Sequence, residues 1–71
     1  MNISVEQARR IAELDAIAAY RELSMYEVSA ELHADGWHVD YRLKEKEMKG
    51  GGPSYLIDAE SGIILWKVYE Q

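Results

Sequence analysis

Polar and apolar residues alternate along the middle of the chain, from Tyr26 to Leu43. A period of two residues is typical of strands that bury one face and expose the other. Asp35 and Gly36 divide the alternation, and this pair favours a two-residue type I′ turn. We therefore predict a β-hairpin in which these residues face each other: Ala34 and Trp37, Leu32 and Val39, Ala30 and Tyr41, Val28 and Leu43.

The segment before this hairpin predicts an amphipathic helix from Val5 to about Leu23. Ser4 and Gln7 have the spacing of a capping box, and no glycine or proline interrupts the segment. The side that we expect to be buried is mostly alanine, which would let the helix lie close to a sheet. Its members are Ala8, Ile11, Ala12, Ala18 and Ala19, with Val5 and Leu23 at the edge.

A second hairpin is predicted after the breaker run Gly50-Gly51-Gly52-Pro53. Its loop ends in Gly62, which suits a left-handed backbone, and Asp58 is expected to cap the turn. We expect these residues to face each other: Asp58 and Ile63, Ile57 and Ile64, Leu56 and Leu65, Tyr55 and Trp66. One apolar face would stay uncovered, because a single helix covers only one face of a sheet. Its residues are Leu56, Ile63, Leu65 and Tyr69.

The order of elements, one helix followed by four strands, predicts a single α+β domain over residues 1–71. We expect the helix to pack on one face of a four-stranded antiparallel meander sheet. A chain of 71 residues buries only a modest core, and without cysteine it has no disulfide to support that core.

Charge narrows the possible function classes. The net charge is -5 and the sequence pI is about 4.9, which argues against a nucleic-acid-binding face and favours a basic partner. The first residues show no basic segment followed by an apolar run, and the longest apolar stretch, residues 63–66, is too short to span a bilayer. We therefore expect a cytoplasmic protein that binds neither nucleic acid nor a membrane.

Candidate metal chemistry is confined to His33 and His38, which the predicted register places directly opposite each other. Opposed Cβ atoms in a sheet lie about 4.5–5.5 Å apart, so the two imidazoles, with Glu31 and Asp40 beside them, could share Zn²⁺. Alternatively, all four are ordinary polar residues of the solvent-facing side, and no metal-site motif supports the zinc hypothesis. The histidines are therefore a weak metal candidate, and we predict no cofactor.

No residue pattern predicts a reaction. The chain has no cysteine nucleophile and no Ser/His/Asp arrangement at a recognisable spacing. The glycine run lacks the Gly-Lys-Ser/Thr sequence of a phosphate loop. Four aromatic residues could form a cage, but their strand positions place them in the core instead. They are Trp37, Tyr41, Tyr55 and Trp66.

Asp15 is a charged residue inside the alanine side of the predicted helix. One interpretation is a carboxylate at the edge of this side, bonded to a neighbouring side chain or to water. The other is a partly buried acid with a raised pKa, which would make it a candidate functional group.

Two parts of the chain resemble the small bacterial immunity proteins of the YrhB type. They are Gly36-Trp37-His38-Val39-Asp40-Tyr41, and Gly50-Gly51-Gly52-Pro53 followed by Leu56-Ile57-Asp58-Ala59-Glu60-Ser61-Gly62-Ile63-Ile64. Proteins of that type have an N-terminal helix with early alanines, a strand with tryptophan, and a glycine-proline step before a strand that ends in aspartate. The resemblance implies a non-enzymatic protein that neutralises a toxin.

A second resemblance is to PepSY-type domains. It is carried by Ile3-Ser4-Val5-Glu6-Gln7-Ala8 and by Tyr55-Leu56-Ile57-Asp58-Ala59-Glu60-Ser61-Gly62. This resemblance implies a domain linked to peptidase inhibition, usually an exported one, and again not an enzyme.

We therefore predict a non-enzymatic protein-binding module, most concretely an immunity-type protein that occludes a basic toxin. The alternatives are a PepSY-like or phage-type inhibitor or regulatory module, and a metal-binding module that uses His33 and His38. The acidic residues expected to contact the partner are Glu27, Glu31 and Asp40. The apolar ones are Leu56, Ile63, Leu65 and Tyr69, which could equally form a homodimer interface.

Overall fold

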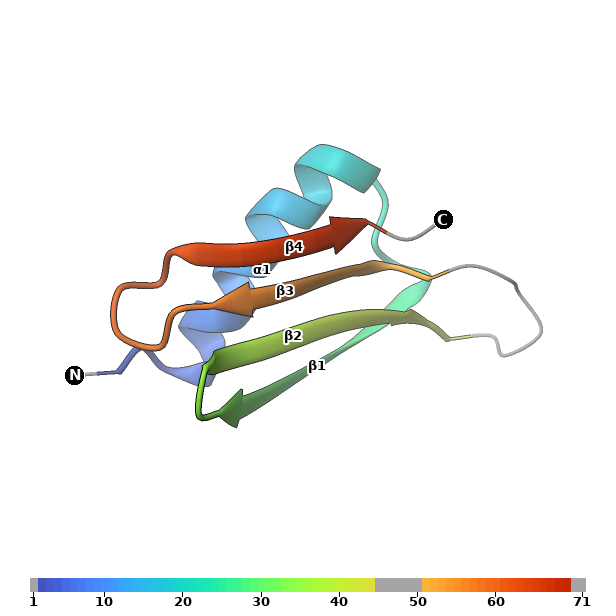
Figure 1. Cartoon of the computed structure of the whole chain (residues 1–71). Helices are drawn as coiled ribbons and strands as arrows, with labels where there is room; N and C mark the ends of the chain where they lie inside the picture. The colour runs from blue at the N-terminus through green and yellow to red at the C-terminus, as the bar shows by residue number, and fades with distance from the viewer. Residues whose placement is uncertain (1, 45–50, 70–71) are drawn as a thin grey trace.

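The chain forms one helix followed by a four-stranded antiparallel sheet (Figure 1), which confirms the predicted α+β fold. The elements are α1 (Val5–Tyr20), β1 (Tyr26–His33), β2 (Gly36–Leu43), β3 (Pro53–Ile57) and β4 (Ile64–Tyr69). Strands that follow each other in sequence are neighbours in the sheet, in the order β1-β2-β3-β4. The computed structural model describes residues 2–44 and 51–69, so Gly50 of the predicted breaker run lies outside these ranges.

Helix α1 begins at the predicted capping box. The Gln7 amide donates to Ser4 Oγ at 3.1 Å, and the Ser4 amide donates to Gln7 Oε1 at 2.7 Å. The helix ends at Tyr20, earlier than the predicted Leu23. Arg21 takes a positive φ of 66° and donates its amide hydrogen to a carbonyl of the last turn at 2.9 Å. No glycine marks this end, so periodicity alone could not locate it.

A stripe of alanines carries the contact between α1 and the sheet. Ala8, Ala12 and Ala16 are fully buried, and their spacing keeps them on one side of the helix. The expectation that Ala18 and Ala19 belong to this contact is wrong, since both are exposed. Both belong to the last turn of α1. In Figure 1 the helix crosses the sheet obliquely, and its C-terminal end extends past β4.

The strands supply the large side chains of the core. Those that are buried are Val39, Tyr41, Pro53, Tyr55 and Ile57, all from the central strands β2 and β3. Trp37 lies partly buried at the margin, where its Nε1 donates a hydrogen bond to the carbonyl of Ile3 at 3.3 Å. The core placement predicted for Tyr41 and Tyr55 is therefore confirmed.

The first hairpin has a different register from the predicted one. His33 faces Gly36, so the predicted pairs of Ala34 with Trp37 and of Leu32 with Val39 are wrong. The observed pairs are Leu32 and Trp37, Ala30 and Val39, Val28 and Tyr41, Tyr26 and Leu43. A displacement by an even number of residues leaves every side chain on its predicted face.

Gly36 explains this difference in register. The predicted type I′ turn needs positive φ at both of its central residues, Asp35 and Gly36. Gly36 has a φ of 136°, but the φ of Asp35 is not positive. A Cβ atom at Gly36 would lie 2.5 Å from the carbonyl oxygen of Ile57 in β3. The glycine therefore permits the close approach of β2 to β3, and the loop consists of Ala34 and Asp35 instead.

The loop of the second hairpin agrees with its prediction. Gly62 has a φ of 78°. Asp58 Oδ2 accepts hydrogen bonds from the Ser61 amide at 2.8 Å and from the Ser61 hydroxyl at 2.7 Å, and these donors hold the pKa of Asp58 below its usual value. The Asp58 amide donates to the carbonyl of Ile63 at 2.8 Å and closes the loop.

The register between β3 and β4 shifts between Leu56 and Ile57, which shows that Leu65 is an extra residue, a β-bulge, at the start of β4. Leu65 therefore has no partner on β3, and the predicted pairs of Leu56 with Leu65 and of Tyr55 with Trp66 are wrong. The observed pairs are Ile57 and Ile64, Leu56 and Trp66, Tyr55 and Lys67, Ser54 and Val68, Pro53 and Tyr69.

The bulge reverses the two faces of β4. One extra residue turns each later side chain to the opposite face of the sheet. Trp66 and Val68 therefore point away from α1, while Lys67 and Tyr69 point toward it.

Replacement of Gly36 by alanine should destabilise the fold more than the same change at Gly62. A methyl at Gly36 meets a backbone oxygen at 2.5 Å, whereas at Gly62 the nearest atom is the terminal methyl of Ile11 at 3.0 Å. We expect Gly36→Ala to lower the free energy of unfolding by more than about 2 kcal/mol, and Gly62→Ala by about 1 kcal/mol. Urea denaturation measures both values, and equal losses would contradict the close approach of β2 to β3.

Candidate binding surface

Helix α1 covers one face of the sheet, and no other described element lies on the opposite face (Figure 1). We call this opposite face the open face. Because side chains alternate along a strand, the register identifies its residues. They are Glu27, Ser29, Glu31 and His33 of β1, His38, Asp40 and Arg42 of β2, Ser54 and Leu56 of β3, and Trp66 and Val68 of β4.

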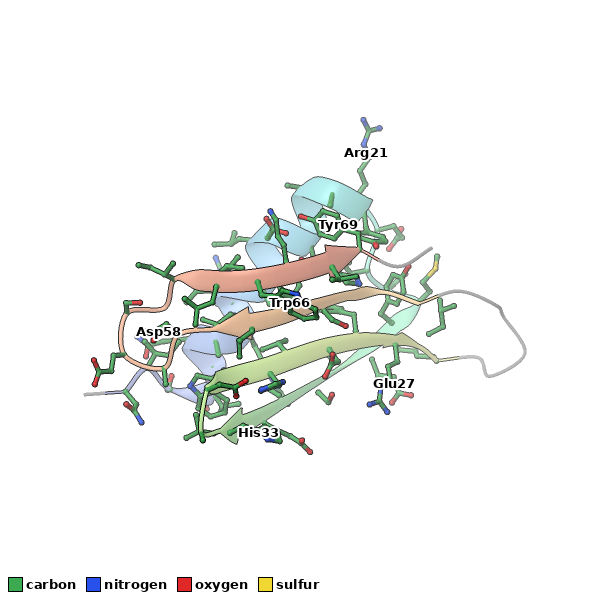
Figure 2. All side chains as sticks on the ribbon, in the orientation of Figure 1. Arg21, Glu27, His33, Asp58, Trp66 and Tyr69 are labelled. Atoms are coloured by element: carbon green, nitrogen blue, oxygen red, sulfur yellow. The ribbon has the colours of Figure 1, made fainter. Side chains whose placement is uncertain are left out.

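Trp66 and Leu56 form the apolar centre of the open face. They face each other across β3 and β4, and Trp66 is 51% exposed. In Figure 2 Trp66 lies in front of the sheet, on the side away from α1. A shallow depression beside it is lined by Asp35, His38, Asp40, Ser54, Tyr55, Leu56 and Trp66. A half-exposed tryptophan bordered by polar groups is typical of protein-contact sites.

The apolar patch predicted from the sequence is only partly assembled. Leu56 lies on the open face, and Ile63 and Leu65 lie exposed in the loop and the bulge beside it. Tyr69 belongs to the helix face, so the prediction that all four share one face is wrong. Trp66, predicted to lie in the core, takes the place of Leu65 opposite Leu56. No local signal in the sequence marks this exchange, and a role of these residues in partner binding stays a prediction.

Carboxylates border the apolar centre. Glu27 and Glu31 are exposed on β1, and Asp40 is partly buried on β2. Glu31 faces His38, and Asp40 faces Ser29. Glu27 faces Arg42, which offsets part of the negative charge. The open face keeps an excess of carboxylates over cationic groups.

His33 and His38 lie side by side, but they do not face each other directly. The prediction that they are directly opposed is therefore wrong. Their ring centroids are 4.4 Å apart. His33 Nε2 lies 3.2 Å from Glu31 Oε2, and His38 Nε2 lies 2.7 Å from Asp35 Oδ1. The hydrogen bond with His38 holds the pKa of Asp35 below its usual value.

Each imidazole is thus paired with its own carboxylate. Across residues 2–44 and 51–69, no group of three or more histidine, aspartate or glutamate side chains has a geometry that could hold a metal ion. The zinc site considered as a weak possibility for His33 and His38 is not assembled among the described residues.

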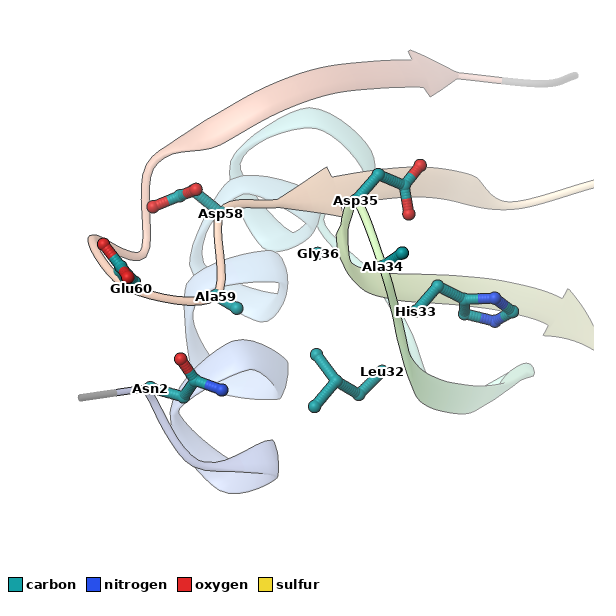
Figure 3. Close-up of a pocket in the computed structure, with 9 residues that line it drawn as sticks. All are labelled: Asn2, Leu32, His33, Ala34, Asp35, Gly36, Asp58, Ala59 and Glu60. Carbon is teal, nitrogen blue, oxygen red and sulfur yellow. The ribbon is translucent and has the colours of Figure 1, made fainter.

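A hollow of about 320 Å³ lies at one end of the sheet, between the two hairpin loops (Figure 3). Its polar lining is mostly acidic and comes from both loops. The residues around it are Asn2, Leu32, His33, Ala34, Asp35, Gly36, Asp58, Ala59 and Glu60. Asp58 is already engaged by Ser61, as described above. The hollow extends the acidic surface of the open face around the end of the sheet.

Asp15 is a residue of α1 that points toward the covered face of the sheet and joins the helix to β3 and β4. Its carboxylate accepts hydrogen bonds from the Tyr55 hydroxyl at 2.9 Å, the Tyr69 hydroxyl at 2.5 Å and Lys67 Nζ at 3.0 Å. Partial burial raises the pKa of Asp15, but the three donors outweigh it, and the pKa lies below its usual value. The interpretation of a carboxylate bonded to neighbouring side chains is confirmed, and the alternative of a raised pKa is wrong.

The chain matches no family model, no curated protein and no solved structure. Within residues 2–44 and 51–69, helix α1 lacks the length and apolar character needed to cross a membrane. The open face is therefore the feature from which a function is inferred.

Replacement of Asp15 by asparagine should remove a pH-dependent part of the stability. The pKa of Asp15 is lower in the folded than in the unfolded chain, so its contribution is complete at neutral pH. That contribution is lost as the pH falls from about 4 through the lowered pKa. We expect Asp15→Asn to lower the free energy of unfolding by about 1–2 kcal/mol at pH 7 and by much less near pH 2, as measured by urea denaturation.

The control for this substitution is Glu13→Gln, at an exposed position of the same helix. It should change the stability little at either pH. A loss from Asp15→Asn that is the same at both pH values would show that the carboxylate charge does not hold β4 to α1.

Proposed function

We propose that the chain is a non-enzymatic protein-binding module that docks its open face onto a basic protein. In its most concrete form it is a cytoplasmic immunity-type protein that occludes a toxin. The observation that carries the proposal is Trp66, which stays half exposed beside Leu56 on a sheet face that α1 does not cover.

The apolar centre has the composition of an interface hot spot. Tryptophan is enriched among the residues that dominate binding energy, particularly where polar groups surround it and exclude water. Burial of the exposed half of Trp66 would remove roughly 100 Å² of surface from water, which is worth about 2–3 kcal/mol. Leu56 adds to the same patch because it faces Trp66 on the neighbouring strand.

Charge favours a basic partner. Glu27, Glu31 and Asp40 lie on the open face, where Arg42 faces Glu27 alone, and the whole chain has a net charge of -5. Complementary charge increases the rate of association and disfavours acidic competitors. The carboxylates would therefore select and orient the partner, and the apolar centre would hold it.

Co-expression with a toxin encoded beside the gene tests this function. We expect the protein to restore growth and to bind the purified toxin in isothermal titration calorimetry, with an affinity that falls as salt is added. Trp66→Ala should weaken binding by roughly 10- to 100-fold, because it removes the centre of the contact.

Leu14→Ala is the matched control, since Leu14 is 59% exposed but lies on α1, behind the sheet. It should leave the affinity unchanged. Equal effects of the two substitutions would contradict docking through the open face. A toxin that neither binds nor is neutralised would contradict the immunity function itself.

A further inference from the structure

Strand β4 forms one edge of the sheet, with β3 as its neighbour on the other side. Within the described part of the chain, no strand pairs with the outer row of its backbone amide and carbonyl groups. Such a row is a template for another strand, and natural proteins usually protect it with charges, proline or a covering element.

The two edges of the sheet are protected to different degrees. Edge strand β1 carries the carboxylates of Glu27 and Glu31 on the open face. Edge strand β4 exposes apolar side chains, with Leu65 at 55% and Trp66 at 51%. Its lysine, Lys67, is turned to the covered face, where a helix carboxylate accepts its hydrogen bond at 3.0 Å. The described part of the β4 edge therefore lacks the charges that would keep another strand away. Its bulge at Leu65 is confined to the start of the strand, and pairing is regular from Trp66 to Tyr69.

Symmetry and charge select among the ways in which two copies could pair. Two β1 edges would bring the carboxylates of Glu27 and Glu31 into proximity with those of the other copy, which is unfavourable. Pairing of β4 with β1 would leave a free edge on each side and would continue into a fibre. Pairing of β4 with β4 about a two-fold axis closes after two copies. Within the described residues of β4, the charged side chain that this pairing brings together is Lys67, which Asp15 neutralises in each copy.

We propose that β4 pairs antiparallel with β4 of a second copy of the chain, so that the two sheets become one. Both helices then lie on the same side, and the two open faces form one continuous surface. In Figure 1 the last turns of α1 extend past β4 at the C-terminal end of that strand. In an antiparallel pair, each of these helix ends reaches over the start of β4 in the other copy. The helices therefore add to the contact on the covered side.

Sedimentation equilibrium from micromolar to millimolar protein tests this dimer. We expect a reversible monomer–dimer equilibrium that tightens with added salt, because each copy carries a net charge of -5. Leu65→Lys should weaken the dimer at least about tenfold, since it places an added positive charge from each copy at the pairing edge. Leu32→Lys is the matched control, because Leu32 is 50% exposed on the opposite edge strand β1, and it should leave the dimer unchanged.

Hydrogen exchange locates the pairing edge without any substitution. Amides of β4 should become more protected as the protein concentration rises, and amides of β1 should not. A monomer at every concentration would overturn the proposal, as would an assembly that grows beyond two copies. A dimer that Leu32→Lys weakens and Leu65→Lys does not would also overturn it. Toxin binding through Trp66 is measured separately, so failure of the dimer leaves the proposed function standing.

Discussion

The alanine stripe of α1 sets the distance between the helix and the sheet, and the rest of the core depends on that distance. Ala8, Ala12 and Ala16 are fully buried but contribute little apolar area of their own. The space beneath them is filled from the strands, above all by Tyr55 and Ile57. A core assembled in this way is thin and lies over β2 and β3. The outer strand β4 therefore needs attachments of another kind.

Those attachments depend on a single extra residue. The bulge at Leu65 turns Tyr69 and Lys67 toward the helix, where both donate hydrogen bonds to Asp15. The ring of Tyr69 also meets that of Tyr20 edge-on, with centroids 5.7 Å apart. The same reversal turns Trp66 to the open face. The feature that ties β4 to the helix thus also creates the apolar centre proposed to bind a partner.

The two proposed contacts respond to charge in opposite ways. A basic partner is attracted by the carboxylates of the open face over about 10 Å at 0.1 M salt, whereas two copies of an acidic chain repel each other over the same range. Strand pairing at β4 acts only at contact distance and gains from backbone hydrogen bonds and apolar burial. A dimer would leave Leu56 and the acidic residues of β1 and β2 accessible, so both contacts fit on one molecule.

The features that could be predicted from the sequence are those whose causes lie within a few residues of each other. The capping box at Ser4, the alternation of the strands, and the loop closed by Asp58 and Gly62 all depend on local hydrogen bonds or backbone preferences. These features were enough to predict the α+β fold, to place the carboxylates of β1 and β2 on a solvent-facing side, and to place Leu56 on a face that the helix leaves uncovered. That the two surfaces are one face follows from the pairing of β2 with β3.

The register of the first hairpin, that of the second hairpin beyond Ile57 and Ile64, and the composition of the apolar centre depend on contacts between elements that are far apart in the sequence. Gly36 is required by its approach to Ile57 on another strand, and the bulge at Leu65 satisfies Asp15 on the helix. These partners are distant in sequence, and no local pattern distinguishes a strand with one extra residue from a regular one. A strand's register follows from the contacts that its two faces and its neighbouring strands make, and these contacts exist only after the helix and the sheet have packed together.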